Sequence, residues 1–193
     1  MKRIPIIIAG IAMVVIVASC DIPSPITYLF APTENAQENC GPAEPTEQDI
    51  NAILSFHKKT FDKSGWERSY AVMPNRVAVT WLHNEFGGLA YFENLLYNCG
   101  GAYDYIDEYL SKDSFAIILE DYDSYEETAY CQVGGLRLHQ FDVLNQGQPY
   151  QIRYWADPQS DTRVYVTMLV FPIDNPHMDE YAKSLNPQLI ECK

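Results

Sequence analysis

The sequence predicts a single α+β domain in which an antiparallel β-meander sheet packs against several α-helices. Apolar residues recur at helical spacing in the first half of the chain, and from Phe115 onward they alternate at strand spacing. Short turns join the strand-like runs, and short connections favour antiparallel neighbours because a parallel crossover needs about a dozen residues. We expect this domain to span residues 46–193.

The first residues have the layout of a secretory signal. Lys2 and Arg3 precede an uncharged apolar stretch, and small residues lead to Cys20. The stretch is short for a membrane span, which needs about 18 apolar residues, so length disfavours the alternative of an uncleaved anchor. We therefore predict a cleaved signal over residues 1–19.

The residues Val17-Ala18-Ser19-Cys20 resemble the lipobox of bacterial lipoproteins. The resemblance covers only the first twenty residues and implies a diacylglycerol on the thiol of Cys20, cleavage directly before it, and added fatty acid such as palmitate. It also implies a lipid anchor in the cell membrane, on the extracytoplasmic (periplasmic or extracellular) face. Two or more acyl chains anchor a protein stably in a membrane and a single chain does not, since each buried CH₂ contributes about 0.8 kcal/mol. Asp21 resembles the residue that retains lipoproteins at the inner membrane of two-membrane bacteria.

Residues 20–45 follow as a lipidated N-terminus and a tether. Five prolines among polar residues favour an extended segment that holds the domain clear of the lipid surface. The net charge of −13 argues against a nucleic-acid partner, which requires clustered Lys and Arg, and against adsorption to anionic lipid beyond the anchor.

Four cysteines remain after Cys20, namely Cys40, Cys99, Cys131 and Cys192. An even number in an oxidising compartment predicts two disulfides, and four cysteines allow three pairings. We favour Cys99–Cys131 and Cys40–Cys192, the second of which ties the two ends of the domain together. There is no Cys/His grouping at metal-ligand spacing, so we expect neither a metal site nor a cofactor.

A helix is predicted to begin after Thr46, with Asp49 completing a capping box, and to run to Ser64-Gly65. Its apolar face carries Ile50, Ile53, Leu54 and Phe61. Residues 66–73 and 77–82 predict two strands around a Pro74-Asn75 turn.

A second helix is predicted from Leu89 to Cys99, because Gly87-Gly88 and Gly100-Gly101 flank apolar residues at helical spacing. A short third helix would direct Ile106, Tyr109 and Leu110 inward.

Five strands are then predicted, with turns at Gly134-Gly135, Asn145-Gln146-Gly147 and Asp157-Pro158. They cover residues 115–122, 128–133, 136–144, 150–155 and 163–171. The last is apolar on both faces and is expected to be central. Asn175 and Pro176 predict the start of a closing helix with Met178, Tyr181, Ala182 and Leu185 buried. This order is similar to the layout of the PsbP and Mog1 proteins, a likeness that transfers no function.

Trp81, His83 and Glu85 form the most suggestive chemical grouping. Residues two apart on a strand share a face, so a His beside a carboxylate could act as a general base while the Trp stacks on a sugar ring. Against this, no nucleophile is identifiable nearby, and we favour a structural role. His57 is expected to be a boundary residue of the first helix.

The acidic run at residues 120–127 matches the start of a calcium loop, since Asp121 and Asp123 alternate as the first ligands of such a loop do. Glu126 falls where the loop needs glycine and Gln132 where it needs a bidentate acid, so a solvated hairpin turn is the better interpretation. No GxSxG or phosphate-binding glycine motif is present.

The leading hypothesis is a membrane-anchored, non-enzymatic binding or scaffold domain. Its expected contact surface is an aromatic-rich face of the sheet or the loop from Trp155 to Asp161, with Trp81 and Trp155 as candidate ligand-binding residues. An envelope protein or polysaccharide is the candidate partner. The competing hypothesis is an envelope-polymer hydrolase that uses His83 with Glu85 or another acid.

Overall fold

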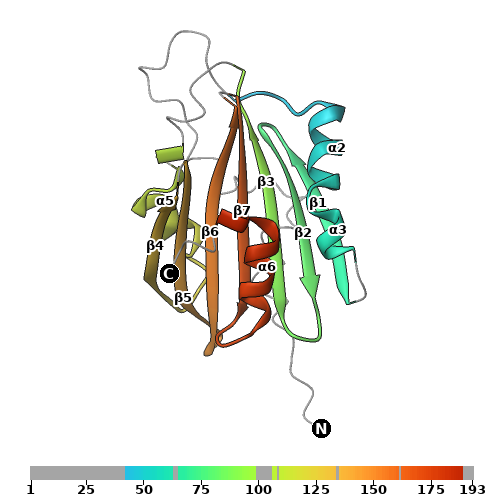
Figure 1. The fold of residues 1–193 in the computed structure, drawn as a ribbon. Helices are drawn as coiled ribbons and strands as arrows, with labels where there is room; N and C mark the ends of the chain where they lie inside the picture. The colour runs from blue at the N-terminus through green and yellow to red at the C-terminus, as the bar shows by residue number, and fades with distance from the viewer. Residues whose placement is uncertain are drawn as a thin grey trace.

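The computed structural model describes residues 42–62, 65–98, 106–107, 109–133, 135–160 and 162–188 (Figure 1). The predicted signal, Cys20, the tether up to residue 41, and Cys40, Cys99 and Cys192 lie outside these residues. In chain order the elements are α2 (Glu47–Ser55), α3 (Lys58–Phe61), β1 (Trp66–Met73), β2 (Arg76–His83), β3 (Gly88–Leu96), α5 (Lys112–Ile118), β4 (Ser124–Val133), β5 (Leu136–Asn145), β6 (Gln148–Ser160), β7 (Arg163–Pro172) and α6 (His177–Leu185).

The strands form one sheet in the order β1-β2-β3-β7-β6-β5-β4, and every neighbouring pair is antiparallel. It consists of two meanders, β1 to β3 and β4 to β7, joined where β3 pairs with β7. The predicted α+β class and antiparallel pairing are confirmed, as is the central place of the strand beginning at Arg163. The four helices of the described part have only four to nine residues each, so helix covers less of the chain than the sequence suggested.

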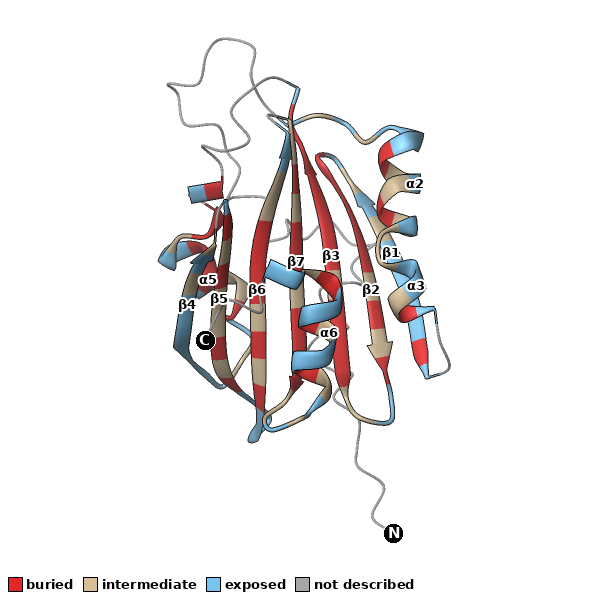
Figure 2. Cartoon of the chain, viewed as in Figure 1, coloured by how far each residue is buried: buried red, intermediate tan, exposed pale blue. Residues whose placement is uncertain are grey.

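Each face of the sheet has its own core. On the three-helix face, which α2, α3 and α6 cover, Ile53, Phe61 and Ala182 pack on the strands. On the α5 face, Ile106, Phe115 and Leu119 from the segment containing α5 pack on the other side. Figure 2 shows that burial is greatest in the middle strands and that β4 is exposed along most of its length. The two ends of the sheet are therefore its accessible parts.

The first helix begins as predicted but ends early. The Thr46 hydroxyl accepts a hydrogen bond from the Asp49 backbone N–H (3.3 Å), and the Thr46 N–H donates to the Asp49 carboxylate (2.9 Å), which completes the capping box. The prediction of one helix to Ser64-Gly65 is wrong, because His57 has a left-handed φ of 52° that separates α2 from α3. His57 thereby turns Phe56 and its own ring onto Phe92.

The predicted helix from Leu89 to Cys99 is wrong, since residues 88–96 form strand β3. Leu89 and Leu95 face the α5 core, whereas Ala90 and Phe92 face the three-helix core. A strand buried on both faces is apolar at nearly every position, and such a run fits helical spacing as well as strand spacing.

The strand predicted at residues 115–122 is also wrong, because residues 112–118 form helix α5. The Ser111 hydroxyl caps it by accepting from the Ser114 N–H (3.2 Å). The preceding helical turn is present, with the Leu110 N–H donating to the Ile106 carbonyl (2.8 Å). Ile106, Tyr109 and Leu110 are buried, as predicted.

The predicted turn at Asp157-Pro158 does not exist, because β6 continues to Ser160. Proline is tolerated there because β5 stops pairing with β6 at Ala156, so beyond that point β6 has a neighbour on one side only. The closing helix begins at His177, one residue later than predicted, and the Asn175 side chain accepts from the His177 N–H (2.9 Å). Of its predicted buried stripe, Met178, Ala182 and Leu185 are buried, whereas Tyr181 is only partly buried.

Candidate functional site

Strand β2 brings Trp81 and His83 to the same face of the sheet, as the two-residue spacing predicted. That face is the buried three-helix face, and the two residues are only 3% and 7% exposed. Trp81 stacks near Phe61 (6.0 Å between ring centroids), and the guanidinium of Arg68 lies over its outer side. Trp81 is therefore a core residue, and the prediction that it lines a surface is wrong.

The His83 ring is enclosed by neighbouring groups. It stacks on Phe86 with ring centroids 3.6 Å apart, and Trp66 meets it edge-on at 5.2 Å. Gly65 covers the remaining side so closely that a Cβ added there would lie 2.3 Å from His83 Nε2. These contacts leave only 7% of His83 exposed, so the ring is held mainly by packing.

The electrostatics of His83 also favour the neutral ring. Burial lowers the pKa of His83, and nearby His177 lowers it further, whereas the carboxylate of Glu85 raises it. Within the described part of the chain His83 Nδ1 has no hydrogen-bond partner, and Glu85 lies exposed in the following turn. The pair proposed as base and acid is thus a covered imidazole and a solvated carboxylate.

His177 lies on the other side of Phe86, with ring centroids 4.8 Å apart. Its Nδ1 is 3.2 Å from a carboxylate oxygen of Glu180, and both side chains are exposed. Phe86 is therefore placed between a buried and an exposed histidine, and the exposed one pairs within its own helix. This cluster fastens α6 to the end of the sheet.

A buried ionic cluster lies on the α5 face, and nothing in the sequence pattern indicated it. Arg76 and Glu93 form an ion pair of 3.0 Å, with side chains 5% and 2% exposed. The hydroxyls of Tyr91 (2.8 Å) and Tyr109 (3.3 Å) donate to the same Glu93 oxygen. Tyr154 stacks on Tyr109 at 5.9 Å.

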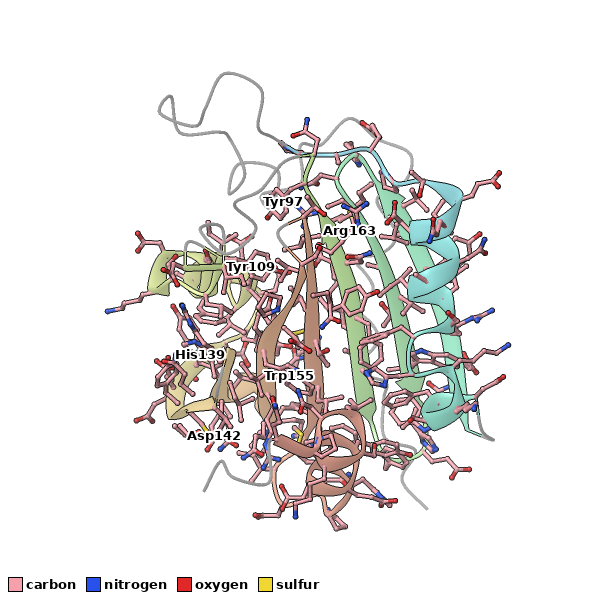
Figure 3. All side chains as sticks on the ribbon, turned by 45° about the horizontal axis from the view of Figure 1, so that its top comes forward. Tyr97, Tyr109, His139, Asp142, Trp155 and Arg163 are labelled. Carbon is pink, nitrogen blue, oxygen red and sulfur yellow. The ribbon has the colours of Figure 1, made fainter. Side chains whose placement is uncertain are left out.

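Burial, reinforced by the negative charge of Glu93, raises the pKa of Tyr91 and of Tyr109 well above the usual 10, so both hydroxyls remain protonated donors. Burial lowers the pKa of Arg76, but Glu93 and the three tyrosines of the cluster together more than offset this effect, so the pKa is raised and Arg76 stays charged. The cluster holds the segment around Tyr109, which is labelled in Figure 3, against the sheet. It is a buried network with every ionised group paired, which is a structural role.

Trp155, the other candidate ligand-binding residue, is also in the core. It lies in β6 on the three-helix face and is 3% exposed. The predicted contact loop from Trp155 to Asp161 is mostly strand, since β6 extends to Ser160. The loop part of this prediction is wrong because no turn at Pro158 interrupts β6, and Trp155 is buried because its side of β6 packs against the three-helix core.

The exposed large apolar side chains gather at the two ends of the sheet. Among the described residues, Tyr70 (57% exposed) and Val72 (49%) lie on β1, Tyr125 (43%) and Tyr130 (53%) on β4, and Leu144 (40%) on β5. The middle strands are covered on both faces. The aromatic-rich accessible surface is therefore at the sheet edges.

Strand β4 is the more exposed edge, since every residue from Ser124 to Tyr130 is exposed. A β-bulge between Glu127 and Ala129 shifts the register by one residue. Three residues of β4 consequently lie opposite β5 residues that face the α5 side. The pairs are Tyr125 with Val143, Glu127 with Phe141, and Tyr130 with His139. The bulge thus places two tyrosines and one carboxylate on a single face, where a regular strand would have turned Tyr130 to the other.

His139 joins this group, although the sequence showed no local partner for it. Its Nδ1 lies 2.7 Å from a Glu127 carboxylate oxygen, and its ring packs against Tyr130 (4.8 Å) and Phe115 (4.7 Å). On the opposite face of β4, Glu126 stands directly across from Asp142. Figure 3 shows His139 and Asp142 at this end of the molecule. We call these residues, Tyr125, Glu126, Glu127, Tyr130, His139 and Asp142, the β4 edge site.

The acidic run of residues 120–127 has two parts. Residues 120–123 form a turn in which the Asp123 carboxylate accepts from the Gly147 N–H (2.9 Å), and β4 begins at Ser124. Across the described ranges no three His, Cys, Asp or Glu side chains are grouped to hold a metal ion. In the same ranges no helix has the length and apolar character to cross a membrane.

No family model and no curated protein matches the chain. Among solved structures it is similar to a mutant of the protein Mog1, with a TM-score of 0.36, 12% identity, and coverage of 65% of this chain and 78% of that chain. It is also similar to protein CV1439 from Chromobacterium violaceum, with a TM-score of 0.20, 12% identity, and coverage of 80% and 94%. TM-scores this low support no argument about this chain.

Proposed function

We propose that this chain is a lipid-anchored extracytoplasmic protein whose folded domain binds a partner without catalysis, and that the β4 edge site is the contact surface. The lipobox-like residues before Cys20 support the anchor, and the proline-rich segment supports a tether. The binding role is supported chiefly by exposure. The histidine that a hydrolase would need, His83, is only 7% exposed, whereas Tyr130 on β4 is 53% exposed.

The competing hydrolase hypothesis requires an imidazole that can reach a substrate. His83 is packed against Phe86, Trp66 and Gly65, and in the described part of the chain it forms no ion pair or hydrogen bond with Glu85. The packing therefore favours a structural role for this histidine. A protein partner suits the β4 edge better than a polysaccharide, because a sheet edge offers backbone donors and acceptors to another strand.

Site-specific photo-crosslinking in the organism that makes the protein tests the proposal. A photo-reactive phenylalanine at position 130 should crosslink to one envelope protein in stoichiometric yield, whereas the same group at position 70 on β1, which is equally exposed, should not. The crosslink should persist in Glu85→Gln and in a folded His83→Gln variant. Equal yields from positions 70 and 130, or a crosslink lost with the Glu85 change, would refute the binding role assigned to β4.

A further inference from the structure

Resting on the proposed function, we infer that the β4 edge site receives an extended segment of a partner protein that carries two adjacent basic residues. The segment adds to the sheet as a strand beside β4. Its two basic side chains pair with Glu126 and Glu127, and its flanking residues pack beside Tyr125 and Tyr130.

The backbone of β4 is suited to strand addition. The sheet order places β4 at one end, so β5 pairs with only one of its two sides. The outward N–H and C=O groups from Ser124 to Tyr130 belong to residues that are all exposed. Such an edge is a template for another extended chain unless charge or irregularity guards it.

The side chains define what that chain must carry. Glu126 and Glu127 are consecutive, so they point to opposite faces of the sheet, Glu126 beside Asp142 and Glu127 beside His139. A single basic residue on an added strand reaches only one of these faces. Two adjacent basic residues reach both faces, because neighbouring side chains of a strand point to opposite faces. The partner segment must therefore carry two basic residues in a row.

Asp142 gives an independent reason to expect a cation. Glu126 and Asp142 are directly opposed across the strand pair, an arrangement in which like charges destabilise a sheet. Asp142 Oδ1 is shielded from solvent and has no hydrogen-bond partner among the described residues. A Lys or Arg side chain delivered next to Glu126 satisfies this carboxylate and removes the repulsion.

A second copy of the chain is a poor occupant, because its own β4 would bring Glu126 and Glu127 against the same two residues. The chain's remaining segments are equally unsuited. Residues 4–57 contain no Lys or Arg, and the adjacent basic pairs in the sequence are Lys2-Arg3, in the predicted signal, and Lys58-Lys59, in α3. The required segment must come from a different protein.

The bulge and the two glutamates make the edge selective. A bulge and charged residues are the usual protections of an edge strand against unspecific pairing. Strand β1, the other edge, pairs regularly along its length. It carries Glu67 beside Arg68, so its charges favour neither an acidic nor a basic partner. β4 therefore discourages acidic and neutral strands while it attracts a basic one.

Hydrogen–deuterium exchange of the full processed protein, purified in detergent, tests this inference. The probe is a capped ten-residue peptide of alternating threonine and valine with a central Lys-Lys pair. It should slow amide exchange in residues 124–130 about tenfold or more and leave β1 unchanged. A matched peptide with Glu-Glu, and a Lys-Lys peptide N-methylated on alternate amides, should give no protection.

The variant Glu126→Gln with Glu127→Gln should weaken binding of the Lys-Lys peptide about tenfold, the effect of two exposed charge pairs. Glu67→Gln on β1 is the matched control and should leave the affinity unchanged. Thermal melting of each variant confirms that it is folded. Unchanged affinity in the double variant, protection at β1, or no protection at millimolar peptide would overturn the inference.

The two proposals fail in different ways. If a crosslinker at position 130 captures a partner while the Lys-Lys peptide does not protect β4, the basic-strand inference is wrong and the binding role stands. If neither result appears, both are wrong. If β4 becomes protected with rising protein concentration alone, a second copy occupies the edge and the inference is overturned.

Discussion

The guanidinium of Arg76 on β2 and the carboxylate of Glu93 on β3 form an ion pair of 3.0 Å inside the core, with both side chains almost fully buried. Tyr91 and Tyr109 donate hydrogen bonds to the same carboxylate. The cluster of these four residues lies on the α5 face. It joins β2, β3 and the segment around Tyr109, which are distant in sequence. Loss of the pair should lower the stability of the domain, because Arg76, Glu93 and Tyr109 are buried and only Tyr91 is partly exposed.

Arg76→Met should lower the free energy of unfolding by about 3–5 kcal/mol, since it leaves Glu93 charged in apolar surroundings. Glu93→Gln should cost a similar amount by leaving Arg76 unpaired, and the double variant should cost less than the two added together. Urea denaturation measures all three. Lys58→Met removes the exposed Lys58–Asp62 pair (3.7 Å) and should change stability by less than about 0.5 kcal/mol. If the loss of stability in the double variant equals the sum of the two single losses, the coupling between Arg76 and Glu93 is refuted.

Gly65→Ala should destabilise the domain by about 2–4 kcal/mol, from left-handed backbone strain at φ +91° and from the clash with the His83 ring. Gly147→Ala is the matched control, because φ is +73° there and no atom lies within 4 Å of the added Cβ. It should cost only about 1 kcal/mol. Equal losses for the two variants in thermal melting would show that His83 is not packed under Gly65.

Stability should fall as the pH decreases from 6.5 to about 4, in part because of His57. Burial lowers the pKa of His57 from 6.5 to about 4, so in this window the unfolded chain takes up a proton that the folded chain does not. The slope from this residue is on the order of 1 kcal/mol per pH unit. His57→Asn, which tolerates the left-handed φ, should flatten the profile measured by urea denaturation at pH 4.5 and 6.5. An unchanged difference between the two pH values would contradict this assignment.

Much of the fold was readable from the sequence where polar and apolar residues alternate or a cap is explicit. The Thr46–Asp49 capping box, the hairpin around Pro74-Asn75 and the two-faced strand from Arg163 follow from local chemistry. Strand β3 did not follow, because burial on both faces removes the alternation that distinguishes a strand. Helix α5 was misread because Phe115, Ile117 and Leu119 also alternate, although Ser111 and Ser114 offered a cap signal.

The candidate site was less predictable than the fold. The spacing correctly placed Trp81 and His83 on one face, but no local signal tells which face of a strand a helix distant in sequence will cover. The β4 edge site depends on a bulge and on the place of β4 at the end of the sheet, and both are set by tertiary pairing. The buried partner of Arg76 likewise lies on a neighbouring strand.

The cysteine pairing stays a prediction. Cys131 lies in β4 opposite Leu138 and packs against the three-helix core, while Cys40, Cys99 and Cys192 are outside the described residues. Alkylation of the native protein followed by non-reducing mass mapping should detect no free thiol among these four. Peptides linking Cys99 to Cys131 and Cys40 to Cys192 are expected, and four alkylated thiols would contradict the disulfides altogether.

The membrane anchor is tested most directly by metabolic labelling with a fatty-acid analogue, followed by separation of membrane and soluble fractions. The wild-type protein should carry the label and sediment with the membrane, because Cys20 bears the acyl chains. Cys20→Ala should be unlabelled, with a domain of unchanged melting temperature. Equal labelling of both proteins, or an unlabelled wild type in the soluble fraction, would contradict the lipid-anchored binding role proposed for this chain.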